Sequence, residues 1–294
     1  MIERVERIEL APGYSISRLL KGGWHLAGGH GAVDPQQAIK DMAQFVEAGI
    51  TSFDCADHYI GVEMLDLVQF FWWDWGISGA IEAAQVLAEL RRAGKIRLIG
   101  ATNFNTDQFS ALIDAGVPMS VHQIQYSLVD RRPDWRMREF CRERGIAVLT
   151  YGHLLGGFFS LDWLGKDEPT GPFSNRSLTK YKLIIDEFGG WALFQKLLAA
   201  MARIGERHGV EIGQVALRWT LDRPGVAGCI VGATSTRHLS ANLRVFDLAL
   251  TDEDRAELAV VTDERRGPPG DCYQLENDRN GPHGRIMRYN QNAL

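Results

Sequence analysis

Short apolar runs alternate along the chain with longer segments whose apolar residues are three or four positions apart. The runs predict buried strands, because a strand that is covered on both faces is apolar throughout. The spaced segments predict amphipathic helices, two of which begin with the N-cap residues Asp34 and Thr251. Strands are expected at residues 16–21, 51–55, 65–71, 96–101, 120–125, 147–151 and 226–231. Helices are expected at residues 34–49, 79–93, 105–115, 135–144, 191–208, 212–221, 236–243 and 251–262.

A repeated order of strand and helix predicts an α/β fold in which helices surround a parallel sheet. A doubly wound sheet and a (β/α)8 TIM barrel both have this order, but the chain lacks the GxGxxG sequence of a doubly wound dinucleotide-binding sheet. Candidate functional residues instead follow many different strands, which is typical of a barrel. They are Asp54, Phe71, Asn103, Gln123, Tyr151 and Gly232. We therefore expect one barrel domain over residues 1–294, in which residues 264–294 form a polar C-terminal loop or tail.

The segment between the second and third predicted strands is too short for a barrel. A crossover between parallel strands takes at least roughly 10–12 residues with its helix, and residues 56–64 show no helical pattern. The pattern also gives seven strands where a closed barrel has eight. The two strands could instead be non-neighbours or antiparallel, but neither arrangement suits a barrel. One βα unit is therefore expected to be missing here.

Composition narrows the class of protein. Hydrophobic residues make up 45% of the chain and charged residues 23%, which is enough apolar material for a large core. The net charge of −5 and the absence of a basic stripe argue against a nucleic-acid partner. No stretch is long enough for a membrane span, and the N-terminus has no apolar signal region. Four cysteines without a CxxC pair indicate reduced thiols, so a cytoplasmic location is expected and the oligomeric state is left open.

Single residues leave their roles undecided. Asp54 and Tyr59 lie five positions apart at a strand end, where Asp often caps a turn and Tyr often packs. Gln123 faces the predicted barrel interior and needs a partner, which is a ligand or another side chain. Tyr151 either stacks on a flat ring or packs. The N-terminus of the predicted helix 236–243, with Ser235 or Thr236 as cap, could hold a phosphate, although any capped helix looks similar.

Five motifs occur in an order and spacing that resemble the aldo-keto reductase family. They are FDCADHY (53–59), GKIRLIGATNF (94–104), VHQIQYSLVDRR (121–132), LTYGHLLGGF (149–158) and IVGATSTRHLSANL (230–243). The resemblance covers about residues 15–262. It implies a (β/α)8 barrel that binds NADP(H) across the C-terminal ends of its strands. It also implies an oxidoreductase that reduces a small-molecule aldehyde or ketone by hydride transfer, without a metal.

The resemblance also implies roles for individual residues. Asp54 resembles the catalytic aspartate and Tyr59 the general acid, while Asn103 and Gln123 resemble the pair that binds the nicotinamide carboxamide. Tyr151 resembles the residue that stacks on the nicotinamide ring. Gly22, Gly23 and Trp24 line the mouth after the first strand, and a substrate pocket is expected from Trp24, Phe71 and Trp72. The adenosine-phosphate end is expected from Gly232, Ala233, Thr234, Ser235, Arg237, His238 and Asn242, with Arg237 or His238 meeting the 2′-phosphate of NADPH.

The chain departs from the family pattern at two catalytic positions. Phe71 stands where the family has a histidine, and the strand that carries the family's lysine has no counterpart between Glu63 and Leu65. Without a neighbouring cation Tyr59 is expected to be a poorer acid, since an unperturbed tyrosine has a pKa near about 10. His58 is an alternative donor, and the long loop 165–181 is either a lid or a surface excursion.

Three interpretations follow from these departures. The first is a working NADPH-dependent carbonyl reductase. The second is a catalytically impaired or inactive relative that serves as a nucleotide-binding or assembly module. The third is an internally deleted version of a normal reductase, whose barrel is open near the second strand and exposes apolar edges.

Overall fold

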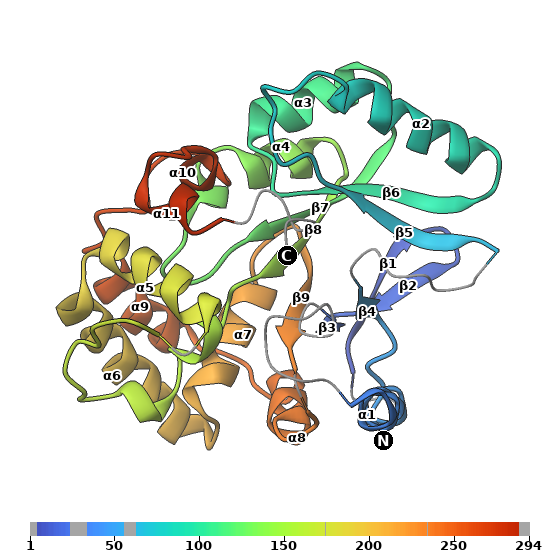
Figure 1. Cartoon of the computed structure of the whole chain (residues 1–294). Coiled ribbons are helices and arrows are strands. Elements are labelled where there is room, and N and C mark those ends of the chain that lie inside the picture. The colour runs from blue at the N-terminus through green and yellow to red at the C-terminus, as the bar shows by residue number, and fades with distance from the viewer. Residues whose placement is uncertain (1–4, 24–33, 56–62, 174, 234, 288–294) are drawn as a thin grey trace.

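The computed structural model describes residues 5–23, 34–55, 63–173, 175–233 and 235–287 of the chain (Figure 1). Its centre is a parallel sheet of seven strands in the order β4-β3-β9-β8-β7-β6-β5. The strands are β3 (Leu19–Gly22), β4 (Phe53–Asp54), β5 (Leu65–Phe70), β6 (Ile96–Thr102), β7 (Met119–Gln125), β8 (Ala147–Tyr151) and β9 (Val226–Gly232). This order is that of a TIM-like barrel with one strand missing between β4 and β5, which confirms the predicted fold class.

Helices follow β3 and each strand from β5 to β9, and they lie outside the sheet (Figure 1). The longer ones are α1 (Pro35–Glu47), α2 (Ala80–Arg92), α3 (Thr106–Asp114), α4 (Met137–Glu143), α5 (Arg176–Phe188), α6 (Trp191–His208), α7 (Ile212–Leu221) and α9 (Asp252–Thr262). The short helices are α8 (Leu239–Leu243), α10 (Gln274–Asn277) and α11 (Pro282–Arg285), with 3-10 turns at Arg132–Asp134, Leu155–Gly157, Leu161–Trp163 and Arg244–Phe246. None of the helices in the described ranges is long and apolar enough to span a bilayer.

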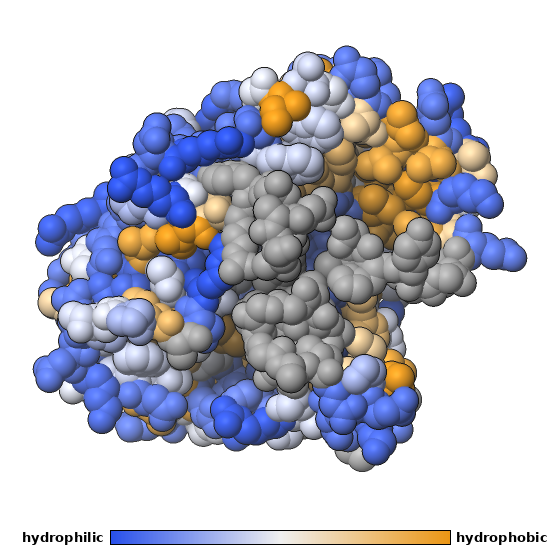
Figure 2. All heavy atoms as spheres, in the orientation of Figure 1, coloured by the Kyte–Doolittle hydropathy of each residue, from blue (hydrophilic) through white to orange (hydrophobic). Residues whose placement is uncertain are grey.

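The sheet is open between β4 and β5. Within the described residues, β4 pairs only with β3 and β5 only with β6, so each strand has one unpaired edge. Apolar side chains are exposed at the start of β5, where Met64 is 38% and Leu65 36% exposed. Figure 2 shows a hydrophobic area on the side of the molecule where β5 and α2 lie. The predicted gap in the chain therefore coincides with an opening in the sheet.

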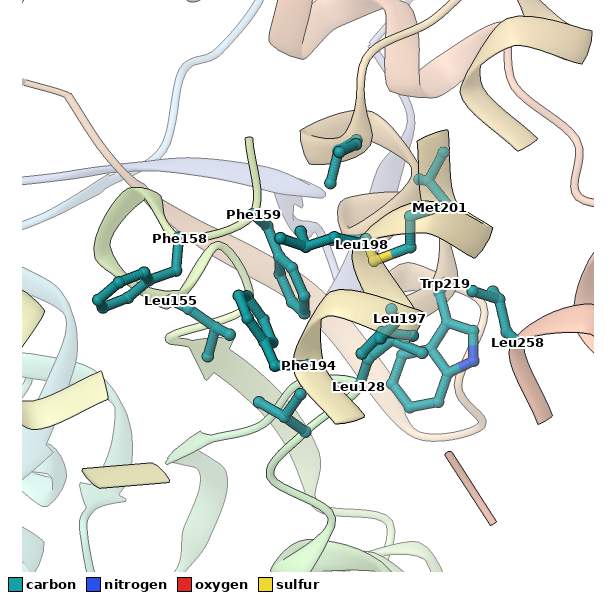
Figure 3. Packing of buried hydrophobic residues seen from close by; sticks show 14 of the residues in the cluster. Leu128, Leu155, Phe158, Phe159, Phe194, Leu197, Leu198, Met201, Trp219 and Leu258 are labelled. Atoms are coloured by element: carbon teal, nitrogen blue, oxygen red, sulfur yellow. The ribbon is translucent and has the colours of Figure 1, made fainter. Parts of the chain in front are cut away.

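Most of the apolar core lies between the sheet and the helices that follow β8. Phe158, Phe194 and Trp219 are almost completely buried there, and Phe159 stacks on Phe194 with ring centroids 5.6 Å apart (Figure 3). A second cluster fills the space between β5, β6, α2 and α3 around Phe104 and Phe109. Dense packing of large rings on both sides holds the strands that carry the candidate site.

An N-terminal hairpin covers one end of the sheet. It consists of β1 (Arg7–Ala11) and β2 (Tyr14–Ser17), which pair antiparallel. Its residues Ile8, Leu10 and Tyr14 pack against interior side chains such as Leu20 and Leu149. The hairpin therefore fills the N-terminal end of the sheet, and the C-terminal ends of the strands are the side available for a site.

One predicted strand and one predicted helix begin later in the structure than the sequence pattern indicates. The predicted strand 16–21 is divided, because residues up to Ser17 pair with β1 while β3 begins at Leu19 and pairs with β9. The predicted helix 236–243 begins only at Leu239, and no side chain caps it. Ser235 and Thr236 are therefore not its N-caps.

Two segments expected to be loops contain helices. Loop 165–181 ends early because Asn175 caps α5, accepting a hydrogen bond from the Leu178 amide at 3.0 Å. The polar tail contains α10 and α11, which place Cys272, Tyr273 and Glu276 in the interior. Pattern analysis missed these turns because each is only four residues long, too short to show a helical period. Figure 1 shows α10 and α11 (red) beside the C-terminal ends of the central strands.

Candidate active site at the strand ends

Polar side chains from four strands meet at the C-terminal edge of the sheet. Asp54 ends β4, Gln69 is the fifth residue of β5, Gln123 lies near the end of β7, and Tyr151 ends β8. Asn103 directly follows β6. Parallel strands bring their carboxyl ends to one edge, so residues far apart in sequence become neighbours.

Asp54 is held by two amides. Its Oδ1 accepts hydrogen bonds from Gln69 Nε2 and Gln123 Nε2, both at 3.0 Å. Gln123 is oriented in turn by Thr102, whose hydroxyl donates to its Oε1 at 2.9 Å. Burial raises the pKa of Asp54, and the two amide donors oppose this rise. No lysine, arginine or histidine forms an ion pair with Asp54 in the part of the chain that the structure describes.

Asn103 and Tyr151 form a second pair at the same edge. The Tyr151 hydroxyl donates to Asn103 Oδ1 at 2.6 Å, and the backbone N–H of Asn103 donates to the backbone carbonyl of Gln123 at 3.1 Å. Asn103 has φ of 62°, a left-handed conformation that Asn tolerates better than most residues. Lys180 Nζ lies 5.0 Å from the centroid of the Tyr151 ring. Burial raises the pKa of Tyr151 well above its ordinary value, so this hydroxyl stays protonated.

The structure describes only the first residues of the segment that follows β3. Gly23 donates its amide hydrogen to the Asp54 carbonyl at 2.6 Å, and a Cβ on Gly23 would stand 2.8 Å from that oxygen. Glycine is therefore required for the close approach of β3 to β4. Trp24, Tyr59 and Thr234 lie outside the described residues, as does His58.

The predicted adenosine-phosphate end lies after β9. Gly232 is exposed at the end of β9, and Ala233 packs beneath it against the cluster around Phe45. The Arg237 guanidinium donates to His238 Nε2 from Nε at 3.1 Å and from Nη2 at 2.9 Å. Asn242 is buried, and its amide donates to the His238 carbonyl at 2.8 Å. Two basic side chains thus stand together at one end of the strand-end edge.

Phe71 and Trp72 point into different surroundings. Phe71 meets the Tyr273 ring edge to face, with centroids 6.0 Å apart. Trp72 instead stacks between Phe70 and Trp73, and its indole N–H donates to the Ile77 carbonyl at 3.0 Å. Phe71 therefore faces the strand-end site, while Trp72 packs toward the loop before α2. A role for either in a substrate pocket stays a prediction.

A buried ionic cluster adjoins the site. Arg132, which follows β7, forms ion pairs with Asp130 at 2.7 Å and with Glu276 of α10 at 2.8 Å. Gln125 donates to Asp130 at 2.6 Å, so the cluster reaches the end of β7. Arg132 holds the pKa of Glu276 down to about 2, against the opposing effect of burial. The charge on Glu276 is therefore kept over the whole physiological range.

Comparisons with known proteins identify the family. The model of the aldo/keto reductase family matches residues 18–64 and 59–262, most of the chain. The chain belongs to the aldo/keto reductase family. The two matched ranges meet at residues 59–64. This is also where the sequence pattern lacks a βα unit and the sheet is open.

Several curated relatives match over a large part of this chain. It is 32% identical over 289 residues to a flagellar radial spoke protein 5 of Chlamydomonas reinhardtii, a match that covers 92% of this chain and 51% of that protein. It is 26% identical over 211 residues to the aldo-keto reductase YhdN of Bacillus subtilis, which covers 70% of this chain and 61% of the relative. The chain thus spans between about half and six tenths of these relatives' lengths.

A solved structure supports the fold. The glycerol dehydrogenase of Gluconobacter oxydans superposes with a TM-score of 0.75 at 20% identity, covering 92% of this chain and 98% of that one. At this identity the likeness concerns the fold. The strand-end edge described above is therefore the C-terminal face of an aldo/keto reductase barrel.

The chemistry of the strand-end residues fits a nicotinamide. A carboxamide needs both a donor and an acceptor, and both kinds of group occur in Asn103, directly after β6, and in Gln123 on the neighbouring β7. Three of these groups already have protein partners, since Gln123 bonds to Asp54 and Thr102 and Asn103 Oδ1 accepts from Tyr151. The carbonyl oxygens Gln69 Oε1 and Gln125 Oε1 are buried without a hydrogen-bond partner among the described atoms. Buried acceptors of this kind leave unmet hydrogen-bonding capacity at the strand ends. No group of three or more potential metal ligands occurs within the described ranges.

Sequence reasoning missed several members of this aldo/keto reductase site. Gln69 lies two positions before Phe71, so strand alternation could have placed it on the same interior face. Tyr273, Glu276 and Lys180 gave no usable signal, because they approach the site through tertiary packing alone. Arg132 and Glu276 are 144 positions apart, and no local pattern relates them.

Proposed function

We propose that the chain binds NADP(H) along the C-terminal ends of its strands and reduces an aldehyde or ketone to an alcohol. The observation that carries this proposal is the convergence of Asp54, Asn103, Gln123 and Tyr151 from four strands into hydrogen-bonded neighbours at one edge. Family membership supports the class of reaction. The names of relatives such as the NADH-specific methylglyoxal reductase of Escherichia coli support it as well.

Each residue has a role in this proposal. The cofactor supplies the hydride when bound. Asn103 and Gln123 orient the carboxamide, and Tyr151 lies beside the ring, so that one ring face is presented to the carbonyl carbon. Tyr59 donates a proton to the carbonyl oxygen as the alcohol forms. Arg237 and His238 bind the 2′-phosphate, which favours NADPH over NADH.

The surroundings of Asp54 predict a slow reaction. A neighbouring cation would lower the pKa of a tyrosine and improve proton transfer, whereas two neutral amides hold Asp54 here. Phe71 brings no polar group to the carbonyl side. We therefore expect turnover well below that of a relative with a charged partner at Asp54.

The test is NADPH binding, followed by NADPH oxidation with simple aldehydes. Asn103→Ala should weaken NADPH binding by about tenfold, since the proposed hydrogen bond to the nicotinamide carboxamide is lost. Gln85→Ala is the matched control, because Gln85 is an exposed amide on α2. Tyr59→Phe should abolish carbonyl reduction and leave NADPH binding intact. Equal NADPH affinity in all four proteins would contradict the proposed site.

A second candidate function is a non-catalytic nucleotide-binding or assembly module. The observation that favours it is Asp54 with no ion-pair partner among the described residues, together with the apolar Phe71. The relative that is 32% identical is named as a radial spoke protein of a flagellum. Tight NADPH binding without reduction of any aldehyde, in wild type and in Tyr59→Phe alike, is the result that would establish this candidate.

Intact mass separates both candidates from an internally deleted reductase. The sequence corresponds to 32.9 kDa, and peptide mapping across residues 58–69 tests the junction. A matching mass means that Tyr59 works without a lysine from a further strand. A mass several kDa higher would restore the missing βα unit and with it the expectation of faster turnover.

A further inference from the structure

Residues 268–277 are fastened to the strand ends by the side chain of Asp271. Its Oδ2 accepts the backbone N–H of Thr106, the first residue of α3, at 2.9 Å, and its Oδ1 accepts the N–H of Cys272 at 2.7 Å. Asp271 and Thr106 are both buried. This contact fixes the start of α10 over the loop that carries Asn103.

A buried ion pair between Arg132 and Glu276 also holds residues 268–277 in place. Arg132 donates to Glu276 from Nη1 at 2.8 Å and from Nη2 at 3.0 Å, and to Asp130 from Nε at 2.9 Å and from Nη2 at 2.7 Å. The three side chains are at most 2% exposed. Two carboxylates on one guanidinium form a strong and directional contact, and loss of Glu276 removes two of its charge-assisted hydrogen bonds while Asp130 remains paired with Arg132.

These two contacts place Cys272 and Tyr273 on the wall of a small cavity that Asn103 also lines. The cavity lined by Asn103, Gln125, Cys272 and Tyr273 has a volume of about 10 Å³, which is room for roughly one water molecule. Tyr273 has φ of 58°, an uncommon conformation for an aromatic residue, and its ring meets Phe71. A nicotinamide ring is much larger than this cavity, so it cannot enter here while Tyr273 stays in place.

We propose that residues 268–277 form a gate over the nicotinamide end of the site, and that the Arg132–Glu276 ion pair is the latch that holds this gate closed. This inference rests on the proposed binding of NADP(H) at Asn103. Opening the gate breaks the Arg132–Glu276 contact and moves Tyr273 away from Phe71 and Asn103. Glu276 and Arg132 are therefore positioning residues, which act through Tyr273.

The first measurement is hydrogen exchange of the full chain without cofactor. Glu276→Gln keeps the shape of the side chain and removes its charge, so exchange at the Thr106 amide and at residues 271–277 should become faster by about tenfold or more. Glu264→Gln is the matched control, because Glu264 pairs with Lys196 on the surface. Unchanged exchange in Glu276→Gln would show that the ion pair is not a latch.

The second measurement is the rate of NADPH binding by stopped-flow fluorescence. Glu276→Gln and Tyr273→Ala should both bind NADPH faster than wild type by several-fold, whereas Glu264→Gln should match wild type. Tyr273→Ala removes only the obstructing ring and keeps the latch, so it also answers the question if Glu276→Gln folds poorly.

The outcomes separate this inference from the proposed function. If wild type and both variants bind NADPH at the same rate, NADPH binding stands and the gate is wrong. If exchange shows residues 271–277 released in Glu276→Gln and neither variant binds NADPH, the latch stands, but the proposed cofactor site is wrong and the segment gates no nicotinamide site. If Glu276→Gln and Tyr273→Ala bind NADPH and wild type does not, the result would support the gate and explain why wild type shows no binding.

Discussion

Gln69 donates a hydrogen bond to Asp54 at 3.0 Å, and the two residues belong to β5 and β4, the outermost strands of the open sheet. Side chains thus meet across a gap that no described strand fills. The bond supplies Asp54 with a neutral donor and leaves its charge unbalanced at a half-buried position.

The stability of the protein should therefore depend on pH through Asp54. Its pKa is raised on folding, so the folded state binds more protons than the unfolded state as pH rises from about 4 through the raised pKa. Over that window ionisation of Asp54 lowers the free energy of unfolding. Asp54→Asn removes this loss, so its advantage over wild type should grow with pH in urea unfolding. Parallel pH curves for the two proteins would contradict the shift.

Breaking the ionic cluster should destabilise the fold strongly. Glu276→Ala removes two buried hydrogen bonds from the Arg132 guanidinium, which keeps Asp130 as its partner, and we expect a loss of about 3–5 kcal/mol in the free energy of unfolding. Glu264→Ala removes an exposed ion pair and should cost less than about 1 kcal/mol. Urea unfolding of both variants gives the comparison, and similar losses for the two would count against a buried latch.

The Tyr151 hydroxyl should matter for cofactor affinity. Tyr151→Phe keeps the ring and removes the bond to Asn103, so the Asn103 side chain is oriented less firmly. One net hydrogen bond corresponds to roughly a 2- to 10-fold weaker binding of NADPH. Titration of intrinsic fluorescence with NADPH measures this change. Tyr14→Phe, on the hairpin at the other end of the sheet, serves as the control.

A histidine in place of Phe71 should help carbonyl reduction. Phe71 faces the site beside Tyr273, and the imidazole introduced by Phe71→His would bring a hydrogen-bond donor to the carbonyl side. We expect kcat/KM to rise by about tenfold or more, within the range of general acid–base effects. Phe70→His is the matched variant, because Phe70 points into the cluster around Phe104 on the opposite face. It should lower stability without raising kcat/KM, and a rise in both variants would refute the assignment of faces.

The open edge of β5 should promote association between chains. An unpaired strand with exposed apolar residues is a template for another strand, and Leu65 lies at its start. Leu65→Lys should reduce light scattering at high protein concentration, since a charge on the edge disfavours pairing. Val260→Lys is the control, because Val260 is also exposed but lies on α9. Equal reductions would indicate a general effect of charge.

Much of the strand order could be predicted from the sequence because each strand is a short apolar run followed by a chemically distinctive residue. Asp54, Asn103, Gln123 and Tyr151 were found in this way, and the structure places them together. The role of Gln69 could not be predicted, because its hydrogen bond to Asp54 depends on how β4 and β5 face each other. The position of Tyr273 could not be predicted either, since the polar tail shows no periodic pattern from which its packing on Phe71 could be inferred.

Two predicted element boundaries differ from the structure for the same physical reason. The predicted strand 16–21 is two strands in the structure, because the chain passes at Arg18 from the hairpin sheet to the central sheet. Apolar residues lie on both sides of Arg18, so the sequence shows no break there. The helix at 236–243 began late because Ser235 and Thr236, although good caps by type, do not cap it. In both places tertiary contacts decided what local preference left open.

Arg132 and Glu276 are 144 positions apart in the sequence, so they are synthesised at different times. At usual rates of synthesis the ribosome adds Glu276 roughly 7 to 30 seconds after Arg132. By the end of that interval β3 to β9 have all been made, yet the guanidinium has had only Asp130 as its nearby carboxylate. The contact between Arg132 and Glu276 can therefore form only after every strand of the central sheet has been synthesised. Closure of residues 268–277 over the strand ends is thus a late event in the synthesis of the chain.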